Sequence, residues 1–347
     1  MRRMSKLASK SAWQRMILRE GVTDGNVAVR KTLHLKQTRA DELDCFSGHR
    51  TTREKTGTLL NSGGNVKDLA RFLHEHSPGG LLPWASQAAA AKQFGLSCAQ
   101  VEAIALESKI LPSRYQRNQQ TLSTDDQLKL FRSRVVVVGC GGLGGYIIEE
   151  LARLGVGTLV VIDPDVFEEH NLNRQLFSTI ASLGLAKVDA VASRVAEVNP
   201  VVTLMPIRAA WLPETGRELL ANADVVADAV DSMATRLVLA EACSELQIPF
   251  VHGAIAGWYG QIATQFPGAS SVRKLYEKKE RRGIERELGN PAFTPALIAS
   301  LQTAEVCKVL LGVGRTLCSR ILFVDLLDMT FSEMTVAAEQ RSAEARP

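Results

Sequence analysis

Residues 134–144 read RVVVVGCGGLG, and this stretch decides the fold. The valines Val135–Val138 predict a short buried β-strand, and an apolar helical stretch to Leu154 follows the glycines. A glycine turn between a strand and a helix leaves backbone N–H groups free to meet phosphate oxygens at the positive end of the helix. The stretch therefore predicts a phosphate-binding loop. Its glycines are Gly139, Gly141, Gly142 and Gly144.

Beyond this loop, short apolar runs alternate with helical patterns as far as Pro267. This alternation is typical of an α/β, doubly wound, Rossmann-like fold with a mostly parallel sheet. After Pro267 a charged segment leads into a long helix, Ala296–Leu311, and two further strands that we expect to add to the sheet. The expected strands are Val135–Val138, Leu159–Ile162, Val201–Met205, Val225–Ala229, Phe250–His252, Ile321–Asp325 and Met329–Met334.

Asp163 ends the strand after the phosphate loop, where a carboxylate accepts hydrogen bonds from ribose hydroxyls. Up to this point the pattern fits a nicotinamide-dependent dehydrogenase equally well. A hydride transferase needs no cluster of cations and amides behind this acid, whereas nucleotidyl transfer does, because charge spreads over the phosphate oxygens. The residues that favour nucleotidyl transfer are Asp165, Asn171, Arg174, Gln175 and Lys187.

Two carboxylates, Asp228 and Asp231, lie where the strand Val225–Ala229 ends. In a doubly wound sheet this edge faces the ligand crevice. Mg²⁺ usually takes one or two protein carboxylates together with substrate phosphates. We expect Asp231 to lie near Mg²⁺ because it is past the strand. Asp228 is the weaker candidate for Mg²⁺, and its alternative roles are to cap the next helix or to support the loop.

Composition divides the chain into four parts. The first part is polar and lacks apolar periodicity, so we expect a disordered leader, and we hypothesise that translation starts near Val66. The second is helical, the third holds the phosphate loop, and the last is expected to be a disordered tail. The four parts are residues 1–66, 67–112, 113–336 and 337–347.

The helical part contains a helix, turn, helix pattern. Helices are expected at Ala88–Phe94 and Ala99–Leu106, with Ser97 as an N-cap. A DNA-binding helix-turn-helix has a similar spacing, but phosphate contacts need cations and the second helix has no arginine. The pattern therefore favours a packing adapter.

Charge is distributed unevenly along the 347 residues, of which 46% are hydrophobic. Residues 1–66 carry 13 Lys and Arg against 6 Asp and Glu, a net charge of +7, and the remaining 28 and 31 give −3. The basic excess therefore belongs to the leader, which disfavours a nucleic-acid partner. No apolar run approaches the roughly 18 residues of a membrane span. With no secretory signal, we expect a cytoplasmic protein with reduced thiols.

Six motifs in order resemble one family, the ThiF/MoeB/HesA adenylyltransferases, which are relatives of ubiquitin-activating enzymes. The resemblance extends from about Pro112 to Thr335. The motifs are Arg114-Tyr115-Gln116-Arg117, Gly139–Gly144, Asp163-x-Asp165, Asn171-Leu172-Asn173-Arg174-Gln175, Lys187 and Asp231.

The resemblance implies that ATP and Mg²⁺ are used to adenylate the C-terminal glycine of a small ubiquitin-like sulfur-carrier protein ending in Gly-Gly. The phosphates would contact the glycine loop, and the ribose would contact Asp163. Asn171, Arg174 and Lys187 would contact the triphosphate, and Asp231 would lie near the metal. In the family, the arginine that matches Arg117 reaches into the partner subunit's site, which implies a homodimer with composite active sites.

The chain departs from the family pattern in its cysteines. Many members bind a structural zinc with two C-x-x-C pairs, but none of the six cysteines here forms such a pair, so we expect no zinc. Some members use a cysteine after adenylation. The charged segment 268–290, where we would expect such a cysteine, contains none. Within this segment, the resemblance places a mobile crossover loop at 273–286. Cys243 is an alternative, although its helical spacing with Leu239 and Leu246 favours core packing.

Three other functions stay open. A tRNA threonylcarbamoyladenosine dehydratase-like enzyme of the same family also adenylates a carboxylate and would be favoured by a basic surface. A NAD-dependent oxidoreductase is disfavoured by the Asn-Arg-Gln cluster and Lys187. A non-enzymatic nucleotide-binding scaffold gains some support from the helical pair.

Overall fold

The computed structural model describes residues 63–276 and 288–336, with side chains from Lys67 onward. They belong to one compact unit that spans Thr56–Pro347. The expected tail, nearly all of the expected leader and most of the expected crossover loop lie outside the described residues. The first described helix, α2, begins at Gly63, a few residues before the expected start of the helical part.

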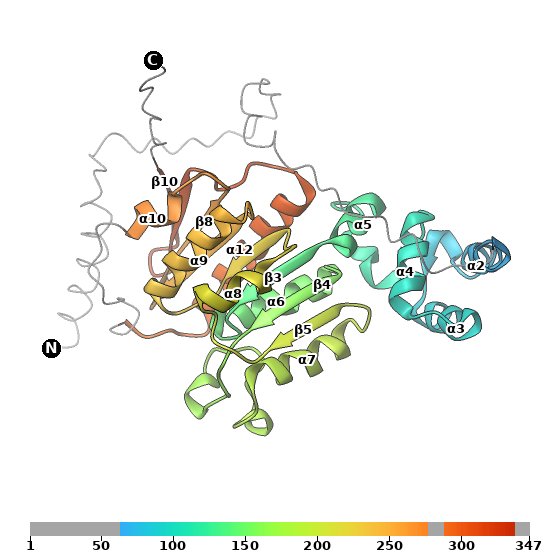
Figure 1. The fold of residues 1–347 in the computed structure, drawn as a ribbon, viewed down its shortest axis with the longest axis horizontal. Helices are drawn as coiled ribbons and strands as arrows, with labels where there is room; N and C mark the ends of the chain where they lie inside the picture. The colour runs from blue at the N-terminus through green and yellow to red at the C-terminus, as the bar shows by residue number, and fades with distance from the viewer. Residues whose placement is uncertain (1–62, 277–287, 337–347) are drawn as a thin grey trace, which may run out of the picture. The chain divides into compact units, whose positions relative to one another are not determined.

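One sheet of eight strands organises the described part of the chain, in the order β10-β9-β8-β7-β6-β3-β4-β5 (Figure 1). The strands from β3 to β7 pair in parallel, and β8, β9 and β10 add in antiparallel orientation at one side. The predicted fold class is confirmed. The strands are β3 (Arg134–Val138), β4 (Thr158–Ile162), β5 (Thr203–Ile207), β6 (Val225–Asp228), β7 (Phe250–Ala256), β8 (Tyr259–Gln265), β9 (Arg320–Asp325) and β10 (Thr330–Thr335).

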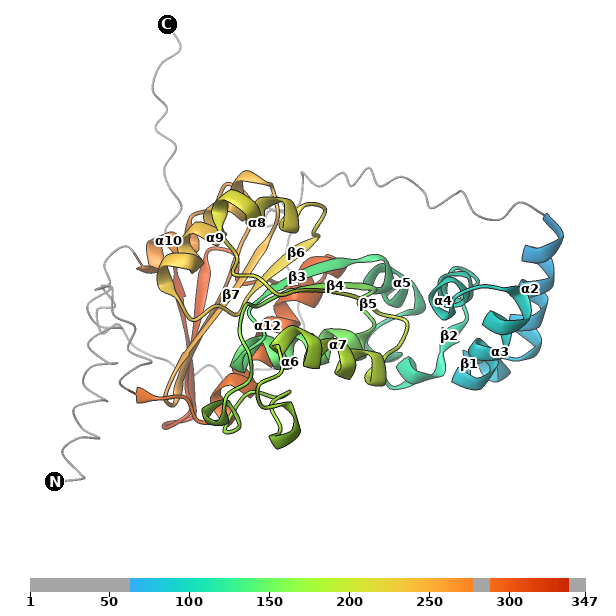
Figure 2. The ribbon, with the colours of Figure 1, turned by 60° about the horizontal axis from the view of Figure 1, so that its bottom comes forward.

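Helices cover both faces of the sheet. Figure 2 shows α6, α7 and α12 on one face and α8, α9 and α10 on the other. None of the helices in the two described ranges combines the length and apolarity needed to cross a bilayer. The bounds are α5 (Thr124–Arg132), α6 (Gly142–Leu154), α7 (Lys187–Val198), α8 (Pro213–Leu220), α9 (Met233–Glu245), α10 (Ser271–Tyr276) and α12 (Phe293–Leu311).

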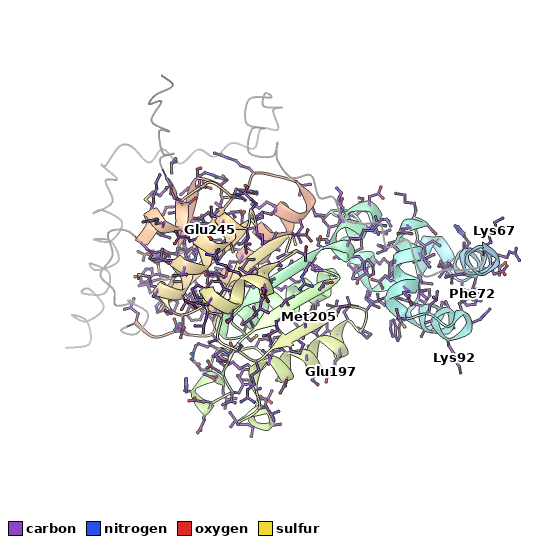
Figure 3. All side chains as sticks on the ribbon, viewed as in Figure 1. Lys67, Phe72, Lys92, Glu197, Met205 and Glu245 are labelled. Atoms are coloured by element: carbon purple, nitrogen blue, oxygen red, sulfur yellow. The ribbon has the colours of Figure 1, made fainter. Side chains whose placement is uncertain are left out.

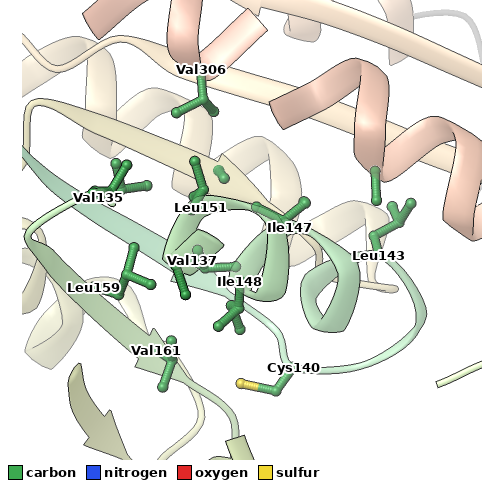
Figure 4. Close-up of a cluster of buried hydrophobic side chains, with 14 of the residues drawn as sticks. Val135, Val137, Cys140, Leu143, Ile147, Ile148, Leu151, Leu159, Val161 and Val306 are labelled. Atoms are coloured by element: carbon green, nitrogen blue, oxygen red, sulfur yellow. The ribbon is translucent and has the colours of Figure 1, made fainter. Parts of the chain in front are cut away.

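The main core lies between the sheet and α6 (Figure 4). Val135 and Val137 of β3 face this core, in agreement with the alternation of side chains along a strand. Ile147 and Leu151 of α6, four residues apart, pack against them. This packing fixes the direction of α6, and therefore the place of its first residue, Gly142, beside the end of β3.

Strand order reverses around β3, which lies between β4 and β6. The crevice for a ligand in such a sheet lies outside the carboxyl ends of the strands at this reversal. The predicted phosphate loop follows β3 directly, so the topology places it at that crevice.

The structure differs from the prediction at several element boundaries and in one strand. The strand expected at Val201–Met205 begins at Thr203, where the backbone N–H donates to the carbonyl of Gly157. Strand β8 was not predicted, because Gln261 and Gln265 interrupt its apolar pattern although all seven residues are buried. Helix α12 starts at Phe293 rather than Ala296, and Pro295 is tolerated in its first turn because those N–H groups lack helical partners.

Three helices at the start of the described chain share a small core of their own, and we call them the helical module. Phe72 of α2, labelled in Figure 3, packs edge to face on Phe94 of α3 with 5.8 Å between ring centroids. The predicted N-cap is confirmed, since Ser97 and Gln100 form a capping box at the start of α4. The module comprises α2 (Gly63–Glu75), α3 (Trp84–Phe94) and α4 (Cys98–Glu107), and the 3₁₀ helix η3 (Ser113–Asn118) connects it towards α5.

Candidate nucleotide site

Two glycines of the loop after β3 are required by the packing of the backbone itself. A Cβ at Gly139, where φ is +101°, would lie 2.4 Å from the carbonyl oxygen of Ala229. A Cβ at Gly144 would lie 1.8 Å from the carbonyl oxygen of Gly139. Real Cβ atoms do not approach backbone so closely, so these two glycines allow the loop to pack between α6 and the end of β6.

The other two glycines have room beside them. A Cβ at Gly141 would meet Nε2 of Gln175 at 3.5 Å, and one at Gly142 would meet Pro295 at the same distance, both ordinary contacts. Internal packing therefore does not require glycine at these positions. Both lie at the N-terminus of α6, where N–H groups and the helix dipole favour an anion.

Asp163 lies directly beneath the loop and is buried. Its Oδ2 accepts a 2.7 Å hydrogen bond from the N–H of Cys140, and its Oδ1 accepts one of 2.8 Å from the N–H of Asp165. Burial raises the pKa of Asp163, and the nearby Lys187 opposes this rise. Each carboxylate oxygen can still accept a further hydrogen bond, and the predicted contact with ribose stays a prediction.

Lys187 is the first residue of α7 and is buried. Its Nζ lies 2.9 Å from Oδ2 of Asp165 and 3.9 Å from Oδ1 of Asp163. The two carboxylates compensate the cost of burying the ammonium close to a second positive helix end. The structure therefore brings together Asp163, Asp165 and Lys187 from the predicted set.

The segment with the predicted Asn-Arg-Gln cluster forms a tight turn beside the loop. Asn171 is buried, its Oδ1 accepts the N–H of Glu168 at 3.0 Å, and its carbonyl accepts the N–H groups of Arg174 and Gln175. Asn171 therefore shapes the turn that positions the two residues after it. Its Nδ2 group is not used by these bonds.

Arg174 is a partly buried cation next to the phosphate loop. Its Cγ would lie 4.0 Å from a Cβ on Gly142. Its Nη1 donates to the carbonyl of His170 at 3.0 Å and to Oδ1 of Asn173 at 2.7 Å, both uncharged acceptors. Desolvation lowers the pKa of Arg174. No ion pair joins this guanidinium to a carboxylate within 63–276 or 288–336, so its charge is available to an anion.

Gln175 supplies a direct sign of a missing partner. The residue is buried, and its Nε2 lies beside Gly141 of the loop. Its Oε1 is buried without a hydrogen-bond partner among the described residues. Such an orphaned acceptor is costly unless a ligand or water donates to it. Together with the open positions Gly141 and Gly142, it fits a bound nucleotide.

The two carboxylates after β6 have different surroundings. Asp231 is exposed and lies two residues beyond Ala229, the residue that contacts Gly139. Asp228 is fully buried, and its Oδ2 pairs with Nε of Arg236 and Nδ1 of His252, each at 2.7 Å. Although burial raises it, these two partners hold the pKa of Asp228 below its ordinary value.

Asp228 therefore supports the loop, as one of its predicted alternatives stated, and the expectation that Asp231 lies near Mg²⁺ stays a prediction. Oδ1 of Asp228 accepts the N–H of Val230, and Arg236 donates to the carbonyl of Val230 at 2.6 Å, which fixes the residue before Asp231. The described residues contain no cluster of three or more His, Cys, Asp or Glu suited to a metal. Mg²⁺ needs only one or two carboxylates when phosphates complete its shell.

Sequence reasoning missed the rest of this buried network. Arg236, His252, Gln261 and Tyr276 come from four different elements, and the Tyr276 hydroxyl accepts from Gln261 Nε2 at 2.7 Å. No spacing of residues in the sequence indicates this network. A buried Arg and a buried His near a strand-ending Asp are visible only in the folded chain.

Arg117 is not brought to the phosphate loop within one chain. It is exposed on η3, and no hydrogen bond or ion pair joins its side chain to the part of the chain that the structure describes. Its neighbour Tyr115 packs on Gly155, which caps the end of α6 opposite to Gly142. Because α6 has 13 residues, its ends lie about 20 Å apart.

The cysteines near the site are poor nucleophiles. Cys140, inside the loop, and Cys243, in α9, are fully buried, and burial raises the pKa of both thiols. Burial likewise raises the pKa of Cys307 to about 12. The prediction that Cys243 packs in the core is confirmed. The expectation of no zinc stays a prediction.

Comparison with known proteins agrees with this geometry. A model of the ThiF family matches residues 115–345. The SAMP-activating enzyme E1 of Haloferax volcanii is 38% identical over 223 residues, covering 63% of this chain and 83% of that protein. The sulfur carrier protein adenylyltransferase of Thermus thermophilus is 34% identical over 226 residues, covering 62% and 83%.

Other relatives are longer than this chain. The match covers 57% of the length of one of them and 50% of the length of another. Among solved structures, Escherichia coli MccB in complex with MccA-N7isoASN has a TM-score of 0.58 at 18% identity, over 74% of this chain and 84% of that one. At that identity the similarity concerns the fold alone.

Proposed function

This chain belongs to the ThiF family of adenylyltransferases, and from that premise we propose that it adenylates the C-terminal glycine of a small ubiquitin-like sulfur-carrier protein ending in Gly-Gly. The names of its relatives from Haloferax volcanii and Thermus thermophilus support this substrate class. ATP supplies the adenylyl group. The products are an acyl-adenylate and pyrophosphate.

One observation carries the proposal: the Arg174 guanidinium, which has no carboxylate partner in the described chain, lies beside Gly142 of the glycine loop, and the buried Lys187 ammonium lies near Asp163 beneath the same loop. In the reaction, a carboxylate oxygen of the carrier attacks the α-phosphorus and the bond to the bridging oxygen of pyrophosphate breaks. Charge grows on the non-bridging oxygens and on the leaving group. Arg174 and Lys187 would stabilise that charge.

No general base is needed, because a terminal carboxylate is already ionised at neutral pH. The work of the chain is orientation and charge neutralisation. Gly141, Gly142 and the α6 N-terminus would hold phosphate, and Asp163 and Gln175 the nucleoside. Asp231 would hold Mg²⁺, which supplies charge neutralisation to the triphosphate when bound.

We further propose a homodimer in which Arg117 completes the site of the partner subunit. The exposure of Arg117, its lack of partners in the described ranges and its place at the far end of α6 support this arrangement. A guanidinium supplied across an interface adds a cation without burying it in the free subunit.

ATP–pyrophosphate exchange with a panel of carrier proteins ending in Gly-Gly tests the function. Wild type should exchange label with at least one carrier, and Arg174→Ala should abolish exchange. Exchange that survives Arg174→Ala unchanged would refute the site. Failure with every carrier, but activity on tRNA, would establish the dehydratase-like alternative instead.

A further inference from the structure

Glu102 of the helical module is fully buried, although nothing in the proposed reaction uses it. A buried carboxylate is costly unless it is paired and hydrogen-bonded. Its Oε2 accepts from Nε2 of Gln87 at 2.9 Å and pairs with Nη1 of Arg114, and its Oε1 accepts from the hydroxyl of Tyr115 at 3.0 Å. Among the described residues, the partners outside the module, Arg114 and Tyr115, therefore both lie on η3.

The same two η3 residues are held from other sides. Nη2 of Arg114 donates to Oε1 of Gln87 at 2.7 Å, and its guanidinium lies over the ring of Trp84, 5.1 Å from the centroid. Although burial lowers it, Glu102 holds the pKa of Arg114 above its ordinary value. The Arg114 cation is thus fixed by three residues of α3 and α4.

Tyr115 connects this network to the nucleotide domain. Its hydroxyl accepts a 2.8 Å hydrogen bond from Nδ2 of Asn199, the residue that caps the end of α7. The same Nδ2 donates to the carbonyl of Ala152 near the end of α6 at 2.9 Å. The two helices that begin at Gly142 and Lys187 therefore end against Tyr115.

The η3 backbone cannot fix its own position strongly. A 3₁₀ helix of six residues has poor hydrogen-bond geometry and is longer than most. The side chains of Arg114 and Tyr115 must therefore hold it, and Arg117 lies one turn beyond Arg114. Loosening Glu102 would free the segment that presents Arg117.

We propose that Glu102 is a positioning residue, through which the helical module holds η3 so that Arg117 is presented to the partner subunit's nucleotide site. This inference rests on the proposed function, because it assigns the module a role in the composite site. It predicts that a substitution in the network lowers the activity of the partner subunit's site and not that of the site in the same chain.

Mixed dimers, purified through two different tags, separate these possibilities. In a dimer of Glu102→Gln with Lys187→Ala, the site with an intact Lys187 receives its Arg117 from a chain with an intact network. The Glu102→Gln homodimer should lose ATP–pyrophosphate exchange by about tenfold or more in kcat with an unchanged KM for ATP. The mixed dimer should recover about half of the wild-type rate. An inactive mixed dimer, or an unimpaired homodimer, overturns the proposal.

The matched control is Glu107→Gln, on the same helix α4, because Glu107 forms an exposed pair with Arg132. It should leave exchange unchanged. A dimer of Arg117→Ala with Lys187→Ala tests the proposed function itself: if it is inactive, the composite site is wrong, whatever Glu102 does. If Glu102→Gln does not fold, the double variant Glu102→Gln, Arg114→Met is used in its place, because it removes both charges of the pair.

A carrier-independent measurement completes the test. Trypsin cleaves after arginine, and cleavage at Arg117 in the proposed dimer requires η3 to leave its bound position. Cleavage at Arg117 should be several-fold faster in Glu102→Gln than in Glu107→Gln under native conditions. Equal rates in both variants would show that Glu102 does not hold η3, and would overturn the proposal even if no carrier were found.

Discussion

Nζ of Lys187 donates a 2.9 Å hydrogen bond to Oδ2 of Asp165, although Lys187 is buried and Asp165 is exposed. The pair lies where the first turn of α7 meets the turn after β4. Because its hydrogen-bond acceptor is the exposed carboxylate, the ammonium can exchange that acceptor for a phosphate oxygen while it stays buried near Asp163. This pre-placed charge is what nucleotidyl transfer requires.

Replacing this ammonium should therefore affect the rate of the chemical step. We expect Lys187→Ala to lower kcat in ATP–pyrophosphate exchange by about 100-fold or more. Lys129→Ala, which removes an exposed lysine paired with Asp126, should leave kcat unchanged. Equal rates for Lys187→Ala and wild type would remove Lys187 from the site.

The carboxylate assigned to Mg²⁺ should reveal itself in the metal dependence. We expect Asp231→Asn to raise the Mg²⁺ concentration for half-maximal exchange by about tenfold or more, because one of few protein ligands is lost. Asp189→Asn, at an exposed carboxylate of α7, is the control. An unaltered Mg²⁺ titration for Asp231→Asn would assign the metal elsewhere.

The phosphate-loop glycines should separate into two classes. Gly144→Ala places a Cβ against the backbone of Gly139, so it should lower the free energy of unfolding by about 3 kcal/mol, the upper end for overpacking. The Cβ of Gly142→Ala would meet only the side chains of Pro295 and Arg174, at ordinary van der Waals distance, so the free energy of unfolding should change by less than about 0.5 kcal/mol. Gly142→Ala should instead weaken ATP binding. Denaturant unfolding and ATP titration together measure both effects, and the same stability loss in the two variants would contradict the distinction.

The buried Asp228 should make stability depend on pH. Asp228→Asn leaves Arg236 and His252 without their anion, and should lower the free energy of unfolding by about 3–5 kcal/mol near neutrality. Because the folded pKa of Asp228 is lowered, its contribution is complete above the unfolded pKa of about 3.9 and is lost as the pH falls through the folded value.

The measurement is denaturant unfolding of wild type and Asp228→Asn between pH 7 and pH 3. Their difference should be constant down to about pH 4 and should shrink below it. Asp126→Asn provides the comparison, since the pKa of Asp126 is also lowered, chiefly by Ser123, but in an exposed N-terminal turn. The decrease in the free energy of unfolding should be much smaller for Asp126→Asn than for Asp228→Asn. A difference that grows on acidification would mean that Asp228 is not held as an anion.

Much of the site could be predicted because its signals are local. The valine run, the glycines and the strand-ending Asp163 each follow from backbone sterics or from the period of a strand, which a short window contains. The cluster from Asn171 to Gln175 is one turn, so its residues had to lie together. The structure adds that Asn171 shapes that turn, and that the Gln175 amide has a free acceptor.

Prediction failed where burial of polar groups depends on distant partners. Strand β8 was missed because Gln261 and Gln265 resemble surface residues, yet Tyr276 and Ala240 accept their N–H groups. Glu102 likewise resembles a solvated position in a helix until Arg114 and Tyr115 are placed beside it.

The sequence by itself determined the doubly wound sheet, the glycine turn after β3 and the family of this protein, because apolar period, glycine turns and ordered motifs are properties of short segments. Only the tertiary structure decided which of the charges near the glycine loop are buried in a structural network and which stay exposed. Asp228 and Asp231 are alike in sequence, but one is buried between Arg236 and His252 and the other is exposed. A charge can be buried only where a partner compensates its desolvation, and that partner is chosen by the fold.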